Sequence, residues 1–236
     1  MDHTEYKRGE IYLNKKRPEP KHMFVVACNK IAGVVAEPDR VLDVGGAAGD
    51  FAAYAAEHFP NTIASVLEYD AALVDQGRDA FPDIEFYVGD ANDMHVISDR
   101  SCTATTMLGV HSVFDDFRPC FEECIRVTQD GGVIVVIDIF NEHPVDALIY
   151  WRHADKTESD YTRGHNLFSK ASISKFLESH ERVLGHTFEP FMVPFDLHKQ
   201  DDPMRSWTEV GADGTKRFMD GLMPLNIQVL TIKTGA

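Results

Sequence analysis

The sequence predicts an α/β fold with a mostly parallel sheet and helices on both of its faces. Three observations support this prediction. Short apolar runs of strand length recur along the chain, several of them are followed by helical patterns, and four of the seven are directly followed by glycine or an acidic residue. These runs, which give seven strands in total, are residues 41–44, 63–67, 84–88, 104–108, 133–139, 186–193 and 227–233.

The segment from Val41 to Phe51, VLDVGGAAGDF, is the most informative part of the chain. A short apolar run is followed by a turn with almost no side chains, and an alanine-rich helical pattern begins at Phe51. Glycines let the backbone adopt positive φ and approach a small ligand closely. A dinucleotide site requires Gly-x-Gly-x-x-Gly, and the last position falls on Asp50, a poor residue for packing a helix against a strand. A different pattern is present, with acidic or small residues at alternate positions: Asp43, Gly45, Ala47 and Gly49.

This alternation resembles motif I of the class I S-adenosylmethionine (SAM) dependent methyltransferases, which is usually Asp/Glu-x-Gly-x-Gly-x-Gly. Ala47 occupies the middle glycine position, and its methyl group disfavours a positive φ there. A glycine-rich turn without a ligand is the alternative interpretation of this motif taken alone. The resemblance implies that SAM is the cofactor, that S-adenosylhomocysteine is the product, and that the SAM-binding loop contains Asp43, Gly45, Gly46, Ala47 and Gly49.

Acidic residues follow the next two predicted strands. Glu68 lies 19 residues beyond Gly49, close to the offset of about 20 residues at which an acid meets ribose hydroxyls in nucleotide-binding βαβ units. Asp90 follows the third strand. The resemblance implies that its carboxylate accepts from the adenine amino group while the Ala91 N–H meets a ring nitrogen. The expected SAM site is completed by residues at the ends of neighbouring strands: Tyr69, Leu108 and Gly109.

The same resemblance implies a Rossmann-like sheet of seven strands whose last strand is antiparallel to its neighbours. The spacing of apolar residues predicts helices over 118–127 and 172–179, and Asp130-Gly131-Gly132 is expected to form a turn. We expect a single domain over residues 1–236. Its parts are an N-terminal helical lid over 1–40, with a helix over 23–35 and with Tyr6 and Tyr12 as lining residues, a SAM-binding core over 41–140, and substrate-side insertions over 141–168 and 194–225.

The charge of the chain bounds its partners. It carries 38 acidic and 23 basic residues, for a net charge of −15, which opposes binding to nucleic-acid phosphates. The basic cluster Lys15-Lys16-Arg17 is interpreted as a solvated loop. Nucleic acid is therefore disfavoured as a partner, although the charge alone does not identify the substrate, and a small-molecule substrate is expected. The stretch 194–224 is also a candidate for a homodimer contact.

The composition also bears on the compartment. No apolar run reaches 18 residues, so no membrane span is expected. The first residues lack the basic and apolar regions of a signal peptide. The four cysteines show no metal-binding spacing, and Cys120 and Cys124 are interpreted as reduced core residues. These expectations favour a cytoplasmic protein.

Methyl transfer from a sulfonium requires alignment and exclusion of water rather than an oxyanion hole. A hydroxyl acceptor also needs a base, for which histidine is suited near neutral pH, whereas an amine acceptor needs no strong base. The candidate bases are His111 after the fourth strand, His143 after the fifth, with Asp138 as an orienting acid, and His165. A packing or surface role is the alternative for each. No metal site is expected, because Ile139 stands where catechol-type enzymes place a second oxygen ligand.

Three functions remain open at this point. The leading hypothesis is SAM-dependent O- or N-methylation of a small polar metabolite such as a sugar or natural product. The phrases HNLFSK (165–170) and PFDLHK (194–199) resemble segments of bacterial methyltransferases of glycan or other small-molecule pathways. The alternatives are methylation of a protein or RNA, and a non-catalytic SAM-binding module.

Overall fold

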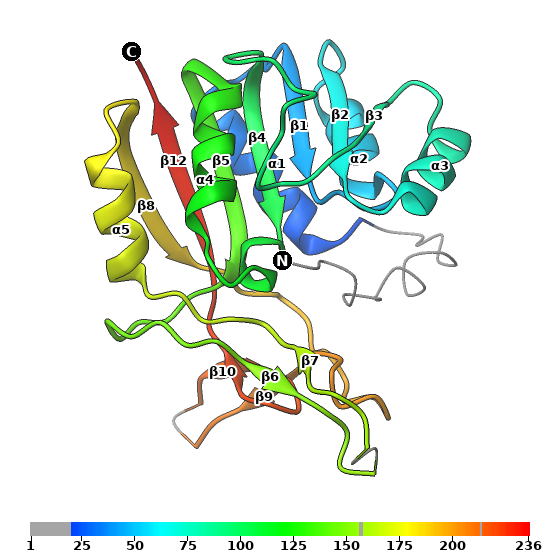
Figure 1. Cartoon of the computed structure of the whole chain (residues 1–236), viewed down its shortest axis with the longest axis vertical. Coiled ribbons are helices and arrows are strands. Elements are labelled where there is room, and N and C mark those ends of the chain that lie inside the picture. Colours follow the sequence, from blue (N-terminus) through cyan, green and yellow to red (C-terminus); the bar gives the residue numbers. More distant parts are fainter. Residues whose placement is uncertain (1–19, 156–157, 213) are drawn as a thin grey trace.

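The computed structural model describes residues 20–155, 158–212 and 214–236 (Figure 1). Tyr6, Tyr12 and the basic cluster 15–17 lie outside the described residues. The helices are α1 (His22–Ala32), α2 (Asp50–His58), α3 (Ala71–Ala80), α4 (Arg118–Val127) and α5 (Lys170–Ser179), with a short 3₁₀ helix, η2, at His111–Val113. None of the described helices is long and apolar enough to cross a membrane.

A seven-stranded sheet forms the centre of the molecule. In spatial order its strands are β3 (Glu85–Val88), β2 (Ile63–Glu68), β1 (Arg40–Val44), β4 (Cys102–Leu108), β5 (Thr128–Ile139), β12 (Ile227–Thr234) and β8 (Val183–Pro190). β12 is antiparallel to both β5 and β8, and the other pairings are parallel. The prediction of a mostly parallel sheet with an antiparallel last strand is confirmed.

Helices cover both faces of this sheet (Figure 1). α1 and α2 pack against one face, where the strands present Val41, Ala104 and Val135, and α3 covers β2 and β3 on the same side. α4 and α5 pack against the other face, where Leu42 and Val136 point. The strand order reverses between β1 and β4. In open α/β sheets, ligands bind beyond the carboxyl ends of the strands at such a reversal.

Three elements show the largest differences from the expected boundaries. The helix expected over 23–35 ends at Ala32, and Gly33 follows it as the C-cap residue. The turn expected at 130–132 is a bulge inside β5, because Cys102 pairs with Thr128 whereas Ala104 pairs with Val133. The strand expected over 186–193 is shifted to Val183–Pro190, and it ends at a proline, which has no backbone N–H to continue the ladder.

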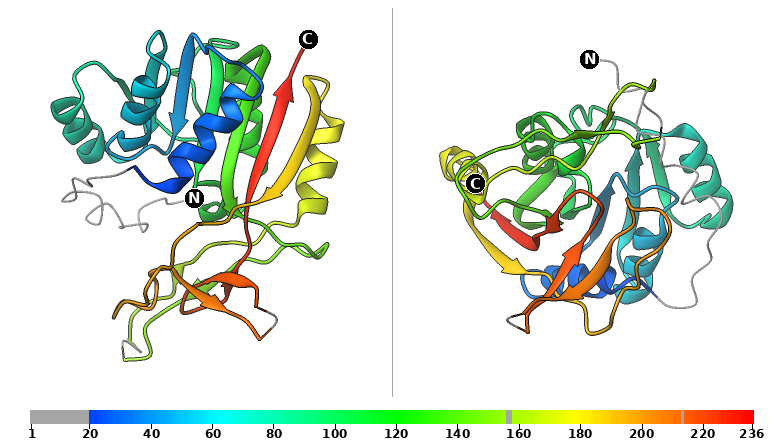
Figure 2. Two further views of the ribbon diagram at one scale, coloured as in Figure 1. Left: turned by 180° about the vertical axis from the view of Figure 1, so that it is seen from behind. Right: turned by 90° about the horizontal axis from the view of Figure 1, so that it is seen from below.

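Two small sheets lie beyond the carboxyl ends of the parallel strands (Figures 1 and 2). A hairpin of β6 (Tyr150–Trp151) and β7 (Thr162–Arg163) comes from the segment 141–168. The second sheet contains β9 (Trp207–Val210), β10 (Lys216–Met219) and β11 (Pro224–Leu225). It is joined to the core through stacked rings of Phe191 and Phe218, whose centroids are 5.9 Å apart. These are the two stretches expected to be substrate-side insertions.

The loop between β1 and α2 has three residues in the left-handed region, with φ of +69° at Gly45, +49° at Ala47 and +90° at Gly49. Ala47 therefore adopts a positive φ although its methyl group disfavours that conformation, which differs from the expectation. The Ala47 N–H donates to Glu68 Oε2 at 2.9 Å, and this long-range bond fixes the backbone in spite of the methyl group. An L-residue in this region carries strain of about 1–2 kcal/mol.

We expect Ala47→Gly to stabilise the protein by about 1 kcal/mol, because glycine relieves the strain at positive φ and the larger entropy of its unfolded chain offsets only part of that gain. Urea unfolding followed by circular dichroism measures the change. Ala48→Gly in the same loop, at a residue without positive φ, is the matched control and should destabilise the protein by about 0.5 kcal/mol. Equal effects of the two substitutions would contradict strain at Ala47.

Candidate functional site

Two loops approach each other closely where the strand order reverses. The loop 45–49 follows β1, and Gly109 and Val110 follow β4. A Cβ added to Gly45 would lie 2.7 Å from Val110 Cγ2, and one added to Gly46 would lie 2.5 Å from Asp43 Oδ2. Neither position has room for a side chain, so the two glycines allow this close approach.

Asp43 lies beneath this loop and is 2% exposed. Thr106 Oγ1, on the neighbouring strand, donates to Asp43 Oδ1 at 2.8 Å. Burial raises the pKa of Asp43 to about 7, while the Thr106 hydrogen bond and the positive charge of Lys21 act in the opposite direction and Glu68 adds to the rise. Lys21, which immediately precedes α1, therefore places a positive charge near the loop. The sequence alone did not identify it, because nothing local relates it to the loop.

Glu68, at the end of β2, is bonded to the same loop. Its Oε2 accepts from the Ala47 N–H at 2.9 Å and its Oε1 accepts from the Asp70 N–H at 3.0 Å. A carboxylate has about four acceptor sites, so these bonds leave capacity for ligand hydroxyls. The neighbouring Tyr69 side chain is exposed.

Asp90 follows β3 and forms a tight turn. Its Oδ1 accepts from the backbone N–H and the side-chain amide of Asn92, at 2.8 and 3.1 Å. Ala91 is buried in the core on the α4 side. Leu108 is half-buried and Gly109 is exposed, with φ of +80°. The turn thus fixes the position of the Asp90 carboxylate at the same edge of the sheet as Glu68.

The predicted SAM-binding residues therefore gather around the carboxyl ends of β1, β2, β3 and β4 (Figure 1). Carboxylates at adjacent strand ends can accept from hydroxyl and amino groups, and they favour a ligand that carries a positive charge. The donor and acceptor groups fit SAM, which has ribose hydroxyls, an adenine amino group and a sulfonium. The assignment of each residue to a ligand atom stays a prediction.

Of the three candidate bases, His111 is fully buried. Its ring stacks on Phe140 with centroids 4.7 Å apart and meets the edge of Phe121 at 5.8 Å. Its Nδ1 lies 2.9 Å from Asp138 Oδ2. An imidazole enclosed in this way does not face an acceptor, so the geometry favours a packing and charge-pairing role over the expected role as base.

His165 is half-buried and contacts Ser112, the residue after His111. Its Nδ1 is 3.2 Å from Ser112 Oγ, and the Ser112 N–H donates to Asp138 Oδ2 at 3.2 Å. The fold thus brings His111 and His165 to the same turn. His143 is exposed, and its backbone N–H donates to Asn141 Oδ1, so it does not belong to this group.

Two further polar residues near Ser112, Asn166 and Asp115, were not assigned an individual role from the sequence. Asn166 is fully buried, and its Nδ2 donates to Phe114 O at 2.7 Å while its Oδ1 accepts from the Ile149 N–H at 2.8 Å. Asp115 accepts from Arg163 Nη2 at 2.7 Å and from the Tyr150 hydroxyl. These bonds fasten the 141–168 segment to the loop after β4. Their position after a parallel strand was the available signal, but their partners are about fifty residues away.

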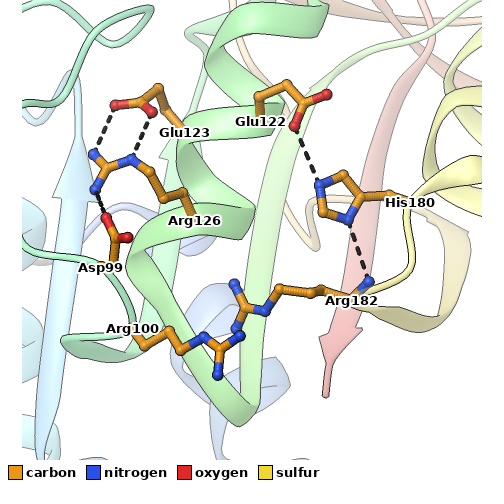
Figure 3. Close-up of a pocket in the computed structure, with 7 residues that line it drawn as sticks. All are labelled: Asp99, Arg100, Glu122, Glu123, Arg126, His180 and Arg182. Atoms are coloured by element: carbon orange, nitrogen blue, oxygen red, sulfur yellow. Dashed lines mark hydrogen bonds and ion pairs between the residues drawn. The ribbon is translucent and has the colours of Figure 1, made fainter. Parts of the chain in front are cut away.

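A charged cleft of about 320 Å³ lies near the amino-terminal ends of β4, β5 and β8, at the opposite edge of the sheet (Figure 3). Arg126 donates to Glu123 and Asp99, and both Arg100 and Arg182 bind Asp130. The arginines are therefore neutralised by carboxylates, and these ion pairs fasten the end of α4. The lining residues are Asp99, Arg100, Glu122, Glu123, Arg126, His180 and Arg182.

Comparison with known proteins finds similarity to methyltransferases. Residues 41–132 match the family described as a methyltransferase domain. Two curated relatives are demethylmenaquinone methyltransferases. The protein of Paenarthrobacter aurescens is 28% identical over 114 residues, which cover 48% of this chain and 42% of the relative. That of Thermotoga maritima is 29% identical over 102 residues, which cover 43% of this chain and 44% of the relative. The matches thus span less than half the length of either relative.

Solved structures share the fold at low sequence identity. The YcgJ protein of Bacillus subtilis superposes with a TM-score of 0.58 and 17% identity, covering 90% of this chain and 99% of its own. An O-methyltransferase family protein of Burkholderia thailandensis gives 0.57 and 11%, covering 91% and 55%. The O-methyltransferase of a Brevibacillus brevis trans-AT polyketide synthase, in complex with S-adenosylhomocysteine, gives 0.54 and 11%, covering 70% and 54%.

The buried Asp43 predicts a pH dependence of stability. Its pKa is about 7 in the folded protein and about 3.9 in an unfolded chain, so the folded state binds the extra proton between these values and stability falls as pH rises through this window. Asp43→Asn removes this loss. Its stability relative to the natural protein should increase with pH between about 4 and 7, by at most about 1.4 kcal/mol per pH unit, and then level off.

Urea unfolding at a series of pH values measures this difference. A pH-independent difference for Asp43→Asn would contradict the raised pKa.

Proposed function

We propose that this chain belongs to the class I SAM-dependent methyltransferase family and transfers the methyl group of SAM to a hydroxyl or amine of a small polar molecule. The observation that carries the proposal is the position of a half-buried histidine, His165, beside the turn that follows β4. That turn begins next to Val110, the residue against which Gly45 of the SAM-binding loop packs. The loop proposed to bind SAM and the histidine proposed to act on the acceptor are thus both in contact with residues 110–112.

The residues of the chain have separate tasks in this proposal. Glu68 and Asp90 bind the hydroxyl and amino groups of SAM, and the loop 45–49 brings the backbone close to it. Bound SAM supplies a methyl group activated by its sulfonium and leaves as S-adenosylhomocysteine. For a hydroxyl acceptor, the acceptor oxygen forms the new bond to carbon, the sulfur keeps the electron pair of the old bond, and His165 takes the hydroxyl proton on its imidazole. An amine acceptor attacks through its own lone pair.

The segments 141–168 and 194–225 are proposed to enclose the acceptor. They lie beyond the carboxyl ends of the parallel strands (Figure 2), where they can exclude water from the reacting atoms. No metal ion is part of the proposal, because Asp138 is engaged by His111 and by the Ser112 N–H. A cytoplasmic protein of one domain remains our working assignment.

A small molecule is favoured over RNA by charge. The chain carries −15, and several basic side chains of the described part are paired with acids, among them Arg40 with Glu85 and Lys216 with Asp196. Demethylmenaquinone is a second candidate acceptor, because two curated relatives are demethylmenaquinone methyltransferases. Incubation with SAM carrying a labelled methyl group distinguishes these candidates. The acceptors to compare are sugars, amines, demethylmenaquinone, RNA and protein extract, and product mass is the readout. Label only in protein or RNA would contradict the proposal.

The SAM site itself can be tested without an acceptor. Calorimetric titration should detect one SAM per chain, and Asp90→Ala should weaken binding about 10- to 100-fold, because a hydrogen bond to a charged group contributes about 1.5–3 kcal/mol. Asp93→Ala, an exposed carboxylate in the same turn, is the control and should bind SAM normally. Unchanged affinity of Asp90→Ala would remove this residue from the adenine assignment.

Replacement of the proposed base should separate binding from turnover. With a hydroxyl acceptor from the comparison above, we expect His165→Ala to lower kcat about 10²- to 10⁴-fold while SAM affinity stays the same. His143→Ala, an exposed histidine of the same insertion, should keep normal turnover. Full activity of His165→Ala on a hydroxyl acceptor would rule out its role as base.

A further inference from the structure

The turn that carries Ser112 is anchored from below by a buried carboxylate. Asp138 is 6% exposed at the end of β5. Its Oδ2 accepts from the Ser112 N–H at 3.2 Å and lies 2.9 Å from His111 Nδ1, and its Oδ1 accepts from the Ile139 N–H at 2.8 Å. One carboxylate therefore joins the end of β5 to η2, the turn after β4.

The partner of this carboxylate is held in place by aromatic packing. The His111 ring is fully buried, stacks on Phe140, and lies 6.1 Å from the ring of Phe168. Burial alone would raise the pKa of Asp138, but its attraction to the His111 ring 2.9 Å away, together with the charge of His165, holds the pKa below its usual value. Asp138 thus stays an anion beneath the turn. The rings of Phe140 and Phe168 pack against His111 and keep it beside Asp138.

Ser112 connects this buried pair to the acceptor side. Its hydroxyl is 3.2 Å from His165 Nδ1, and its carbonyl accepts from the Asn166 N–H at 2.7 Å. Two adjacent residues of the insertion are therefore bonded to one fully buried serine. The Asn166 side chain adds a bond to Phe114 O at the end of the same turn. The ring of His165 is held through its Nδ1, while the residue remains half-exposed.

We propose that Ser112 is a positioning residue that orients the imidazole of His165 toward the acceptor, with the buried Asp138–His111 pair holding Ser112 in place. Its mechanistic meaning rests on the proposed function, in which His165 takes the acceptor proton. The orientation of the ring is a property of the protein without any acceptor. It can therefore be measured separately from methyl transfer.

The test uses the full chain labelled with ¹⁵N-histidine and saturated with S-adenosylhomocysteine. Long-range ¹H–¹⁵N spectra report the hydrogen bonding of each imidazole nitrogen, and loss of signals in His165→Gln assigns its resonances. Ser112→Ala should move the Nδ1 resonance of His165, because it removes the hydroxyl that lies 3.2 Å from Nδ1. Ser112→Cys should have a smaller effect, because a thiol is a weaker hydrogen-bonding group.

The control is His143→Gln, at an exposed residue, which should leave the His165 resonances unchanged. Affinity for S-adenosylhomocysteine shows that each variant is folded, and Ser112→Cys serves if Ser112→Ala does not fold. Unchanged His165 resonances in the folded Ser112 variants would overturn the proposal.

Kinetics then relate position to function. With a hydroxyl acceptor, Ser112→Ala should lower kcat about tenfold without changing the KM for SAM, because a misaligned base slows only the chemical step. If His165→Ala retains full turnover, the proposed base is wrong, but the spectra still decide whether Ser112 orients His165. The kcat comparison uses an acceptor whose methylation is slowed by His165→Ala. If the spectra of Ser112→Ala change but its kcat with that acceptor stays normal, the positioning role is overturned.

Discussion

The hydrogen bond from Thr106 to Asp43 is the interaction on which the SAM side of this structure depends. It joins β1 to β4 at the point where the strand order reverses, and it lies directly under Gly46, where a Cβ would meet the carboxylate at 2.5 Å. A buried carboxyl with a pKa near 7 lowers stability at neutral pH. Asp43 therefore costs stability, but it holds the loop 45–49 in place above it.

The loop is then fixed from a second side by Glu68. Its bond to the Ala47 N–H holds a non-glycine residue at φ +49°, so strain in the loop is balanced by a contact from β2. Asp43, Glu68 and Asp90 end three neighbouring strands, and mutual repulsion of such acids is unfavourable without a cation. Lys21 supplies part of that charge to Asp43. A ligand carrying a sulfonium would supply more, which makes the acidic edge a reasonable place for SAM.

The sequence predicted those features that local pattern determines. The apolar runs located all seven strands of the main sheet, and the helix over 118–127 agrees with α4 at both ends. Local pattern did not predict the backbone conformation or burial of residues whose environment is formed by distant parts of the chain. Ala47 takes a positive φ because of Glu68, 21 residues away. His111 is buried because Phe140 and Phe168 close around it after the chain has folded, and no spacing near His111 indicates that enclosure.

The same distinction separates the two halves of the candidate site. The SAM side is built from short segments that follow β1 to β4, and the match to the methyltransferase domain family, residues 41–132, covers the core of that side. Asp138, His165 and Asn166 lie beyond the match, and Ser112 meets His165 across 53 residues of sequence. In the proposed function, a change in the insertion alters the acceptor without disturbing the SAM side. On that proposal, relatives that share the matched region need not share an acceptor, and the residues that determine it lie where Ser112 meets the insertion.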